Sequence, residues 1–397
     1  MATSDPAIRG VRVIIAGGGT SGHVLPGIAI AEMLEDHGVP ARFVHFVGAS
    51  GGIDGRLLNN TDYPKTLFPV VGLRRSMHLV AIKQNLNMVR QFLVARRALV
   101  RFFKEWKPGV VVSVGGYASL PAMSAAAKLG IPRVVVSYDS RPGLATRRQA
   151  RKATIVTKAT AVSTLPNAIL VGAPVRRELR QLNCLAVRQD ARARLGLPDG
   201  AFVVGVLGGS LGSGILNSVA QETAEKLGVE KLGAIDNESG GTSREVAWYH
   251  IAGERFLDSC KASAPAGANY TVVGYESDMA SVYAACDLLV TRAGASTISE
   301  IATVGVASII VPWAGASENH QEHNAQSLVG EGAAIMILES EFTAKRLTTH
   351  VKSFSSEPSV LEEMRNKAFA SGVLHRAGEL GVIVATVAIT GNAPVRR

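Results

Sequence analysis

The 397-residue sequence has few cysteines and few aromatic residues, and both shortages exclude classes of protein. Cys184, Cys260 and Cys286 are an odd set without a CxxC pair. A disulfide framework or a zinc site is therefore not expected, and a reducing compartment is favoured. Aromatic residues make up 5% of a chain that is 47% hydrophobic. The core must then consist mainly of aliphatic side chains, as in parallel sheets covered by helices, and the length predicts two domains.

Long apolar runs are missing as well. No apolar stretch reaches the length of about 18 residues that a membrane-spanning helix needs, and residues 1–10 lack the basic start and apolar segment of a signal peptide. We therefore expect neither a transmembrane helix nor a cleaved leader.

Acidic residues are absent between Tyr63 and Lys104, where basic residues alternate with apolar ones although the whole chain carries a net charge of +10. A basic amphipathic surface of this kind can lie on anionic lipid headgroups or on nucleic acid. It can equally be the solvated face of an ordinary core helix. No RNA-binding or zinc-finger signature accompanies it, so nucleic acid is the least favoured partner.

The apolar segments alternate with glycine-rich loops and helical patterns. Strands are predicted at 11–16, 42–47, 110–114 and 134–136, and, after a turn at 172–174, at 202–207, 248–251, 270–273, 288–291 and 308–311. Strands that alternate with helices predict parallel sheets with right-handed crossovers. Two such series predict two Rossmann-like α/β domains with a ligand at the carboxyl ends of the strands.

The first glycine loop, Gly17-x-Gly19-x-x-Gly22, follows the first strand and opens a helix. Such a loop lets phosphates approach the backbone and the positive end of the helix dipole. Binding of NAD also needs an acid at the end of the second strand, and Phe46-Val47-Gly48 has none, which disfavours NAD. His23 follows the loop directly. It is a candidate general base, or else a histidine that hydrogen-bonds the backbone at the helix start.

Three further segments of the second half carry polar or small residues after predicted strands. Gly208–Gly212, with Ser210, can hold a pyrophosphate or can simply be a tight turn. The segment 292–300 offers Ser296 and Thr297 for helix capping or phosphate binding, and Glu300 for ribose hydroxyls. The segment 317–324 presents polar groups that suit a sugar or a solvated helix start.

Taken together, the segments GGGTSGHVLPGIAIA (17–31), VGGYASLP (114–121), GAPVRRE (172–178), LGGSLGSGILN (207–217), 278–305 and 318–334 resemble the MurG family. The resemblance implies a GT-B fold and metal-independent, inverting transfer of N-acetylglucosamine from UDP-GlcNAc to a polyprenyl-diphosphate-linked acceptor, lipid I, for peptidoglycan synthesis. It implies no cofactor, no nucleic acid, and a peripheral position on the cytoplasmic face of the bacterial membrane, which residues 63–104 would contact.

The resemblance also assigns residues to roles. His23 matches the invariant loop histidine, and Tyr117 matches the acceptor-side tyrosine. The residues matched to substrate binding are Thr20, Ser21, Gly22, Tyr117, Arg176, Ser210, Ala295, Ser296, Thr297, Glu300, Gln321 and Asn324.

The sequence departs from the family pattern at several of these places. Asp139 stands where the family has an asparagine near the sugar, so it is both a binding candidate and a rival to His23 as the base. Glu276 aligns with a main-chain contact to uracil. Leu211 and His320 stand where many members have glutamine. These departures leave room for a different acceptor or for a catalytically silent UDP-sugar-binding protein.

The expected domains are 1–175, facing acceptor and membrane, and 176–375, binding the UDP-sugar. Residues 376–397 are expected to form a C-terminal helix and tail that packs back on the first domain.

Overall fold

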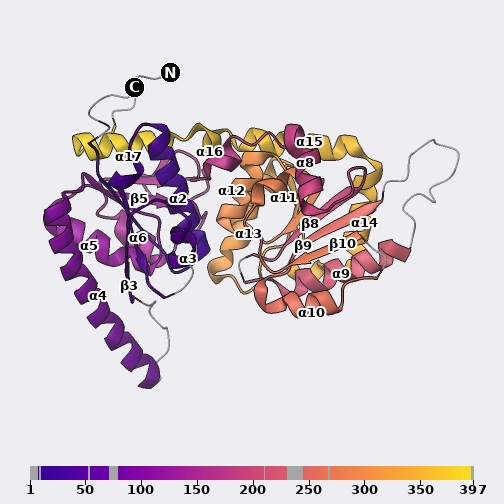
Figure 1. Cartoon of the computed structure of the whole chain (residues 1–397), viewed down its shortest axis with the longest axis horizontal. Helices are drawn as coiled ribbons and strands as arrows, with labels where there is room; N and C mark the ends of the chain where they lie inside the picture. Colours follow the sequence, from indigo (N-terminus) through magenta and orange to yellow (C-terminus); the bar gives the residue numbers. More distant parts are fainter. Residues whose placement is uncertain are drawn as a thin grey trace. The chain divides into compact units, whose positions relative to one another are not determined.

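The structure is a computed structural model that describes residues 8, 10–51, 54–70, 79–209, 211–229, 245–266 and 269–394; the side chains of 79–86 and of Ser317 are outside this description. The chain folds into two compact units (Figure 1). Unit 1 consists of Met1–Arg177 and Leu374–Arg397, and unit 2 of Glu178–Val373. Each unit is described by itself below. The polar loop expected at 235–243 lies outside the described residues.

Unit 1 contains a parallel seven-stranded sheet in the order β3-β2-β1-β4-β5-β6-β7. Its strands are β1 (Val13–Ala16), β2 (Val44–Ala49), β3 (Lys65–Phe68), β4 (Val110–Ser113), β5 (Arg133–Ser137), β6 (Ile155–Lys158) and β7 (Ile169–Leu170). Its helices are α2 (Ser21–Asp36), α3 (Asp54–Asn59), α4 (Leu79–Trp106), α5 (Leu120–Leu129), α6 (Leu144–Ala150), α16 (Val373–Ala377) and α17 (Glu379–Thr390), with short 3-10 turns η1 (Ala41–Phe43) and η2 (Tyr117–Ser119). The short helix α7 (Arg177–Arg180) begins at the last residue of the first segment of unit 1 and continues into unit 2.

Helices cover both faces of this sheet. The core on one face joins β1, β2 and β4 to α2 and to the C-terminal helix α17, which contributes Leu380, Ile383, Val384 and Val387. The core on the other face joins the alternate strand residues to α4 and α5. Because the central strands β1 and β4 are buried on both sides, their residues are almost all apolar, which explains the continuous Val and Ile runs of the sequence.

Unit 2 contains a parallel six-stranded sheet in the order β10-β9-β8-β11-β12-β13. Its strands are β8 (Phe202–Leu207), β9 (Val246–Ile251), β10 (Asn269–Val273), β11 (Leu288–Thr291), β12 (Ser308–Ile310) and β13 (Ala334–Met336). Its helices are α8 (Cys184–Leu195), α9 (Gly214–Val229), α10 (Leu257–Ala262), α11 (Met279–Ala285), α12 (Ala295–Val304), α13 (His320–Gly330), α14 (Ala344–Ser356) and α15 (Pro358–Ser371), with turns η3 (Glu254–Phe256), η4 (Ser317–Asn319) and η5 (Glu339–Glu341).

All nine predicted strands are present, with ends within two residues of those expected. Four strands were not predicted: β3, β6, β7 and β13 are short, and β3, β7 and β13 lie at sheet edges, so their apolar signal is weak. In both sheets the strand order reverses beside the first strand of the unit, between β1 and β4 and between β8 and β11. Loops that leave such neighbouring strands in opposite directions open a crevice for a ligand, and the two predicted glycine loops follow β1 and β8.

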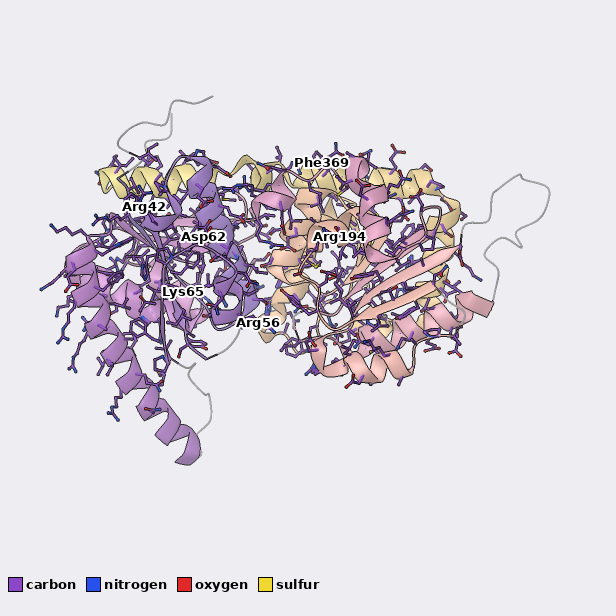
Figure 2. All side chains as sticks on the ribbon, in the orientation of Figure 1. Arg42, Arg56, Asp62, Lys65, Arg194 and Phe369 are labelled. Atoms are coloured by element: carbon purple, nitrogen blue, oxygen red, sulfur yellow. The ribbon has the colours of Figure 1, made fainter. Side chains whose placement is uncertain are left out.

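The structure corrects the extent of the basic amphipathic surface expected over 63–104. Lys65 belongs to β3, and its ammonium group donates to the carbonyl of Leu58 at 3.1 Å; Figure 2 labels this residue in unit 1. In the second half of α4 the side chains of Ala95, Leu99 and Phe103 are buried in the core and are not available to a membrane. This part of α4 is therefore an ordinary core helix with a basic outer face.

Exposed apolar residues lie near the middle of α4, and in Figure 1 the amino-terminal end of this helix projects beyond the sheet. Val89, Leu93 and Val94 are exposed, Val94 to 56%, beside the exposed Arg90 and Arg97. Arg74, Arg75 and the side chain of Lys83 lie outside the described residues. No helix within the described residues is long and apolar enough to cross a membrane.

A buried ion cluster ties α8 to the start of β11. Asp287 accepts hydrogen bonds from Arg192 at 2.8 Å, from Arg188 at 2.9 Å and from the backbone amide of Val203 at 2.9 Å. Arg192 and Asp287 are both buried. Removal of one member of such a pair leaves an uncompensated charge in the interior.

We therefore predict that Asp287→Ala lowers the free energy of unfolding by about 3–5 kcal/mol, measured by urea denaturation. Glu222→Ala is the control, because Glu222 forms an exposed pair with Lys226 on α9, and it should leave the transition midpoint essentially unchanged. A similar stability for Asp287→Ala and the native chain would contradict this account.

Candidate functional site

The first glycine loop of unit 1 has a backbone that only glycine adopts without strain. Gly18 has φ 152° and Gly19 has φ 90°. A Cβ atom at Gly18 would lie 1.9 Å from Oδ2 of Asp54, and one at Gly19 would lie 2.7 Å from the hydroxyl of Tyr117. The loop is therefore pressed between two side chains that come from other parts of the chain, and glycine is required by both backbone angle and space.

Asp54 holds this loop, and the sequence reasoning missed it. Its side chain is 0% exposed. Oδ1 accepts the amide of Gly19 at 2.7 Å, and Oδ2 accepts the amide of Ala49 at 2.8 Å. The ends of β1 and β2 are thus joined through one carboxylate. An acid that binds ribose was expected directly at the end of the second strand, where Gly48 stands instead. Asp54 occurs later, at the start of α3, and its carboxylate binds backbone amides.

His23 lies in the first turn of α2, and its ring packs against Gly115 and Gly116 at the end of β4. Nδ1 is 2.9 Å from the hydroxyl oxygen of Thr20. Thr20 is the N-cap residue of α2, but its side chain makes no capping hydrogen bond. When Nδ1 donates its proton to Thr20, Nε2 carries the lone pair and can accept a proton.

The charges around His23 come from two carboxylates. Burial lowers the pKa of His23, and the negative charges of Asp139 and Asp54 offset part of this effect. The net pKa is below the ordinary 6.5, so the imidazole is neutral at pH 7. This is the state that a general base requires.

Asp139 reaches this place because β5 ends two residues before it. Its neighbour Tyr138 donates its hydroxyl proton toward the carbonyl of Gly22 at 2.5 Å, with the carbonyl of Val114 at 3.2 Å. Tyr138 therefore links the end of β5 to the start of α2 and to the end of β4. The sequence marked Asp139 as a departure from the family, a binding candidate and a rival base, but it gave no role to Tyr138, which anchors the histidine turn within unit 1.

Tyr117 begins η2 just after β4. Burial and the negative charge of Asp54 raise the pKa of its phenol, so the hydroxyl stays protonated and can donate to a ligand. Unit 1 thus gathers most of its predicted site residues at the carboxyl ends of β1, β4 and β5: Thr20, Ser21, Gly22, His23, Tyr117 and Asp139.

Arg176 is not part of this group within unit 1. The backbone amide of the next residue, Arg177, donates to Glu32 at 2.5 Å, and the Arg177 guanidinium pairs with Glu35 and Asp36 at 3.0 and 2.7 Å. These acids occupy the last turns of α2. Nine residues separate Glu32 from His23, or about 14 Å of helix.

In unit 2 the loop after β8 passes close to the backbone that follows β9. A Cβ at Gly212, where φ is 70°, would lie 2.2 Å from the carbonyl oxygen of Ala252. Leu211 is 72% exposed. Ser210, the predicted pyrophosphate contact, lies outside the described residues.

The helix α12 starts after β11 without a side-chain cap. Its N-cap residue is Gly294, so the expected alternative of a plain Ser or Thr cap is not observed. The first amides of a helix have no acceptor within the helix, and here they belong to Ala295, Ser296 and Thr297. A helix start of this kind can bind an anion.

Gln321 and Asn324 on α13 hold the neighbouring loops together. Oε1 of Gln321 accepts the amides of Trp313 at 2.9 Å and Ala293 at 3.2 Å. The buried Asn324 donates to the carbonyl of Ala293 at 3.2 Å. Their positions were expected to meet sugar hydroxyls. For Gln321 the amide Nε2 is the group with hydrogens for a ligand, since Oε1 already accepts two bonds.

Arg292 links four strand ends, which the sequence reasoning did not foresee. It follows β11 and donates to the Ser213 hydroxyl at 2.7 Å, to the carbonyl of Val311 at 3.1 Å and to Glu339 at 2.6 Å. Burial alone would raise the pKa of Glu339, but hydrogen bonds from Arg292 and from the amide of Ala314 lower it. The loops after β8, β11, β12 and β13 are thereby fixed to one guanidinium.

Glu276 and Glu300, the two glutamates that were predicted to lie at the nucleoside, each accept a hydrogen bond from a tyrosine. Glu276 accepts the hydroxyl of Tyr249 at 2.7 Å, and Glu300 accepts the hydroxyl of Tyr283 at 2.6 Å. Burial and the hydrogen bond to Glu276 raise the pKa of Tyr249. Both tyrosines were missed, because nothing in a local motif marks a partner from a different helix or strand.

The two halves offer complementary chemistry. Unit 1 presents a neutral histidine, a protonated phenol and a carboxylate. Unit 2 presents an uncapped helix start, a glycine loop and a fixed carboxylate. No cluster of three or more His, Cys, Asp or Glu side chains in the described part of the chain could hold a metal ion.

Comparison with known families matches both units. Residues 13–158 match the glycosyltransferase family 28 N-terminal domain, and residues 203–377 match the glycosyltransferase family 28 C-terminal domain. The two matches cover most of the described chain and include the residues gathered above.

Similar proteins carry one name. Proteins of Desulforudis audaxviator and Myxococcus xanthus, 36% and 35% identical, cover 91% and 93% of this chain and 94% and 91% of their own lengths. Both are named UDP-N-acetylglucosamine–N-acetylmuramyl-(pentapeptide) pyrophosphoryl-undecaprenol N-acetylglucosamine transferase. The crystal structure of MurG from Acinetobacter baumannii is 27% identical with a TM-score of 0.66 and covers 90% of this chain and 94% of its own. The expected GT-B fold is confirmed.

We predict that Asp54→Ala loosens the first glycine loop. Two buried amides lose their acceptor, and each such loss costs about 1–3 kcal/mol. Urea unfolding and hydrogen exchange at Gly19 and Ala49 measure the effect. The exposed Asp62, labelled in Figure 2, provides the control variant Asp62→Ala, which should change stability by less than about 0.5 kcal/mol. Unaltered hydrogen exchange at both amides in Asp54→Ala would show that Asp54 does not hold the loop.

Proposed function

Because the chain belongs to the MurG family of glycosyltransferase family 28, we propose that it transfers N-acetylglucosamine from UDP-GlcNAc to undecaprenyl-diphospho-MurNAc-pentapeptide (lipid I), giving lipid II for peptidoglycan synthesis. The names of its relatives support this donor and a lipid-linked acceptor. The single observation that carries the proposal is the buried His23 in the first turn of α2, whose pKa is lowered and whose Nδ1 lies 2.9 Å from the hydroxyl oxygen of Thr20.

The proposed reaction is a direct in-line displacement at the anomeric carbon. The C4 hydroxyl oxygen of MurNAc forms a bond to C1 of the α-linked sugar, and the bond between C1 and the UDP oxygen breaks with inversion. Nε2 of His23 takes the hydroxyl proton, a contribution of roughly 10²–10⁴-fold. The electron pair of the broken bond leaves with UDP, so the product is β(1→4)-linked.

Fixed dipoles of unit 2 suit the charge that develops on UDP. The uncapped start of α12 directs its amides and the helix dipole at an anion, and preorganised N–H groups of this kind stabilise a leaving group without reorganisation. We assign Ser210 and the amides of Ala295, Ser296 and Thr297 to the pyrophosphate. The Glu300 carboxylate is assigned to the ribose.

The remaining contacts are assigned by the family resemblance. The main chain at Glu276 meets uracil. Gln321 meets the GlcNAc hydroxyls through Nε2, and Asn324 acts by fixing the loop at Ala293. Thr20, Ser21 and Gly22 are assigned to the donor, and Tyr117 is assigned to the acceptor. Arg176 is assigned to the nucleotide.

We predict that His23→Ala lowers kcat by about 10²–10⁴-fold, measured by product formation from UDP-GlcNAc and a soluble lipid I analogue. Asp139→Asn should keep most of kcat but change the pH profile. Loss of the Asp139 charge removes an effect that raises the pKa of His23. Activity falls as His23 becomes protonated, so the acid limb of kcat/KM should move to lower pH in this variant.

A different base would give the opposite pair of results. If His23→Ala retains kcat while Asp139→Asn abolishes turnover, Asp139 is the base. The identity of the product by mass separately tests the reaction itself, since another donor or acceptor would point to a different transferase of the same fold.

The lipid-linked acceptor suggests that the protein works as a peripheral protein on the cytoplasmic face of the bacterial cell membrane. We assign the contact to the outer face of α4 between Val89 and Arg97, where exposed apolar residues adjoin Arg90 and Arg97. Apolar side chains can enter the headgroup region while cations meet anionic lipid. The buried side chains of Ala95, Leu99 and Phe103 do not belong to this surface.

We predict that Arg90→Gln with Arg97→Gln weakens binding to vesicles of anionic lipid by roughly 30-fold, from about 1 kcal/mol per cation, in a co-sedimentation assay. Lys345→Gln, an exposed cation of α14 in unit 2, is the matched control and should bind like the native chain. Native binding should fall as salt rises. Vesicle binding that does not change with salt concentration would exclude electrostatic docking.

A further inference from the structure

Tyr283 is a buried residue of α11 whose hydroxyl has a charged partner. Its side chain is 1% exposed, and its hydroxyl donates to Oε2 of Glu300 at 2.6 Å. A buried hydroxyl needs a hydrogen bond. A carboxylate acceptor at this distance makes that bond short and charge-assisted, and such bonds are about twice as strong as neutral ones. The Glu300 side chain is therefore oriented before any ligand arrives.

The other end of α11 is fixed to the turn at Glu276. Asp278 caps α11 by accepting the Ser281 amide at 3.1 Å and the Ser281 hydroxyl at 2.6 Å. The amide of Asp278 in turn donates to Oε1 of Glu276 at 2.7 Å, and Tyr249 donates to Oε2 of the same carboxylate. Arg194, labelled in Figure 2, pairs with Asp278 at 2.8 Å.

The short helix α11 thus connects the Glu276 turn, which is assigned to uracil, with the Glu300 carboxylate, which is assigned to ribose. Tyr283 lies four residues after Met279, where α11 begins. A rotation or shift of α11 would displace both groups together. Unit 2 therefore contains a nucleoside-reading unit made of the Glu276 turn, α11 and Glu300.

We propose that Tyr283 is a positioning residue that fixes the Glu300 carboxylate so that it accepts the 2′ and 3′ hydroxyls of ribose together, and that α11 couples this selection to the base. The inference rests on the proposed function, because it takes a ribonucleoside diphosphate as the ligand. It adds to that function the origin of sugar selectivity in the nucleotide.

The physical reason lies in the freedom of the glutamate. A carboxylate has about four acceptor positions, and Tyr283 occupies one on Oε2. This hydrogen bond restricts the rotation of the carboxylate, so the ribose hydroxyls meet an acceptor of defined orientation. Without the phenol hydroxyl, Glu300 loses one of the contacts that orient it, and binding must then restrict more of its side-chain motion.

The experiment measures the affinities of UDP and 2′-deoxy-UDP by calorimetry. The native protein should prefer UDP by roughly tenfold or more, as expected when a hydrogen bond to a charged group is lost. Tyr283→Phe keeps the ring and removes the hydroxyl. It should weaken UDP by about 3–10-fold, reduce the preference for ribose, and raise KM for UDP-GlcNAc with kcat unchanged.

The matched control is Tyr270→Phe. Tyr270 on β10 donates or accepts a hydrogen bond with Nδ1 of His250 at 2.9 Å, so it is another tyrosine with a side-chain partner in the same sheet layer. Both nucleotide affinities should stay native in this variant. A merely structural effect of losing a tyrosine hydroxyl would appear in both variants.

A double-mutant cycle tests whether Tyr283 acts through Glu300. Glu300→Ala should lose the preference for ribose, and Tyr283→Phe added to it should change nothing further. Should Tyr283→Phe unfold, Glu300→Asp replaces it, because the shorter side chain keeps the charge but withdraws it from the phenol; it too should lose the preference.

The outcomes separate the two proposals. A native ratio of UDP to 2′-deoxy-UDP affinity in Tyr283→Phe, or in Glu300→Asp where that variant is used, overturns the role of Tyr283, as does an added effect in the Glu300→Ala background. A native protein that binds neither UDP nor UDP-GlcNAc overturns the proposed function itself.

Discussion

The buried Asp54 carboxylate is the constraint on which the geometry of unit 1 depends. A loop of three glycines has no side chains to hold its shape, and Asp54 supplies the missing contacts by accepting amides from the ends of β1 and β2. The same negative charge influences His23 and Tyr117. One residue therefore shapes the loop backbone and the protonation of the two groups beside it, which makes the loop a rigid support for acid–base chemistry.

Unit 2 solves the same problem with side chains that bind neighbouring loops. Arg292, Gln321 and Glu339 each hold the backbone or a side chain of a loop that leaves a different strand. The surface presented to a ligand is consequently made of backbone amides and of groups left over from internal bonds, such as Nε2 of Gln321. Preorganisation of this kind favours stabilisation of a leaving group, because the donors need not reorient during the reaction.

The two units share one topology but use it differently. In each, the crevice opens where the strand order reverses beside the first strand. Unit 1 places His23, Tyr117 and Asp139 there, and unit 2 places a glycine loop, an uncapped helix start and side chains that Arg292 fixes. The side chains of the two units therefore differ although the backbone arrangement of the two sheets is similar.

The sequence by itself determined the two parallel α/β units and nine of the strands, and it predicted candidate site residues in each unit, because buried strands, glycine loops and helix starts are local patterns. It could not determine Asp54, Tyr138, Tyr283 or the loop contacts of Arg292, since each acts on a residue far along the chain. Nor could the sequence show which parts of the basic segment 63–104 are buried. The same alternation of cations and apolar residues occurs in a strand, in a core helix and on a membrane-binding face. Only tertiary packing decided which of these side chains are buried.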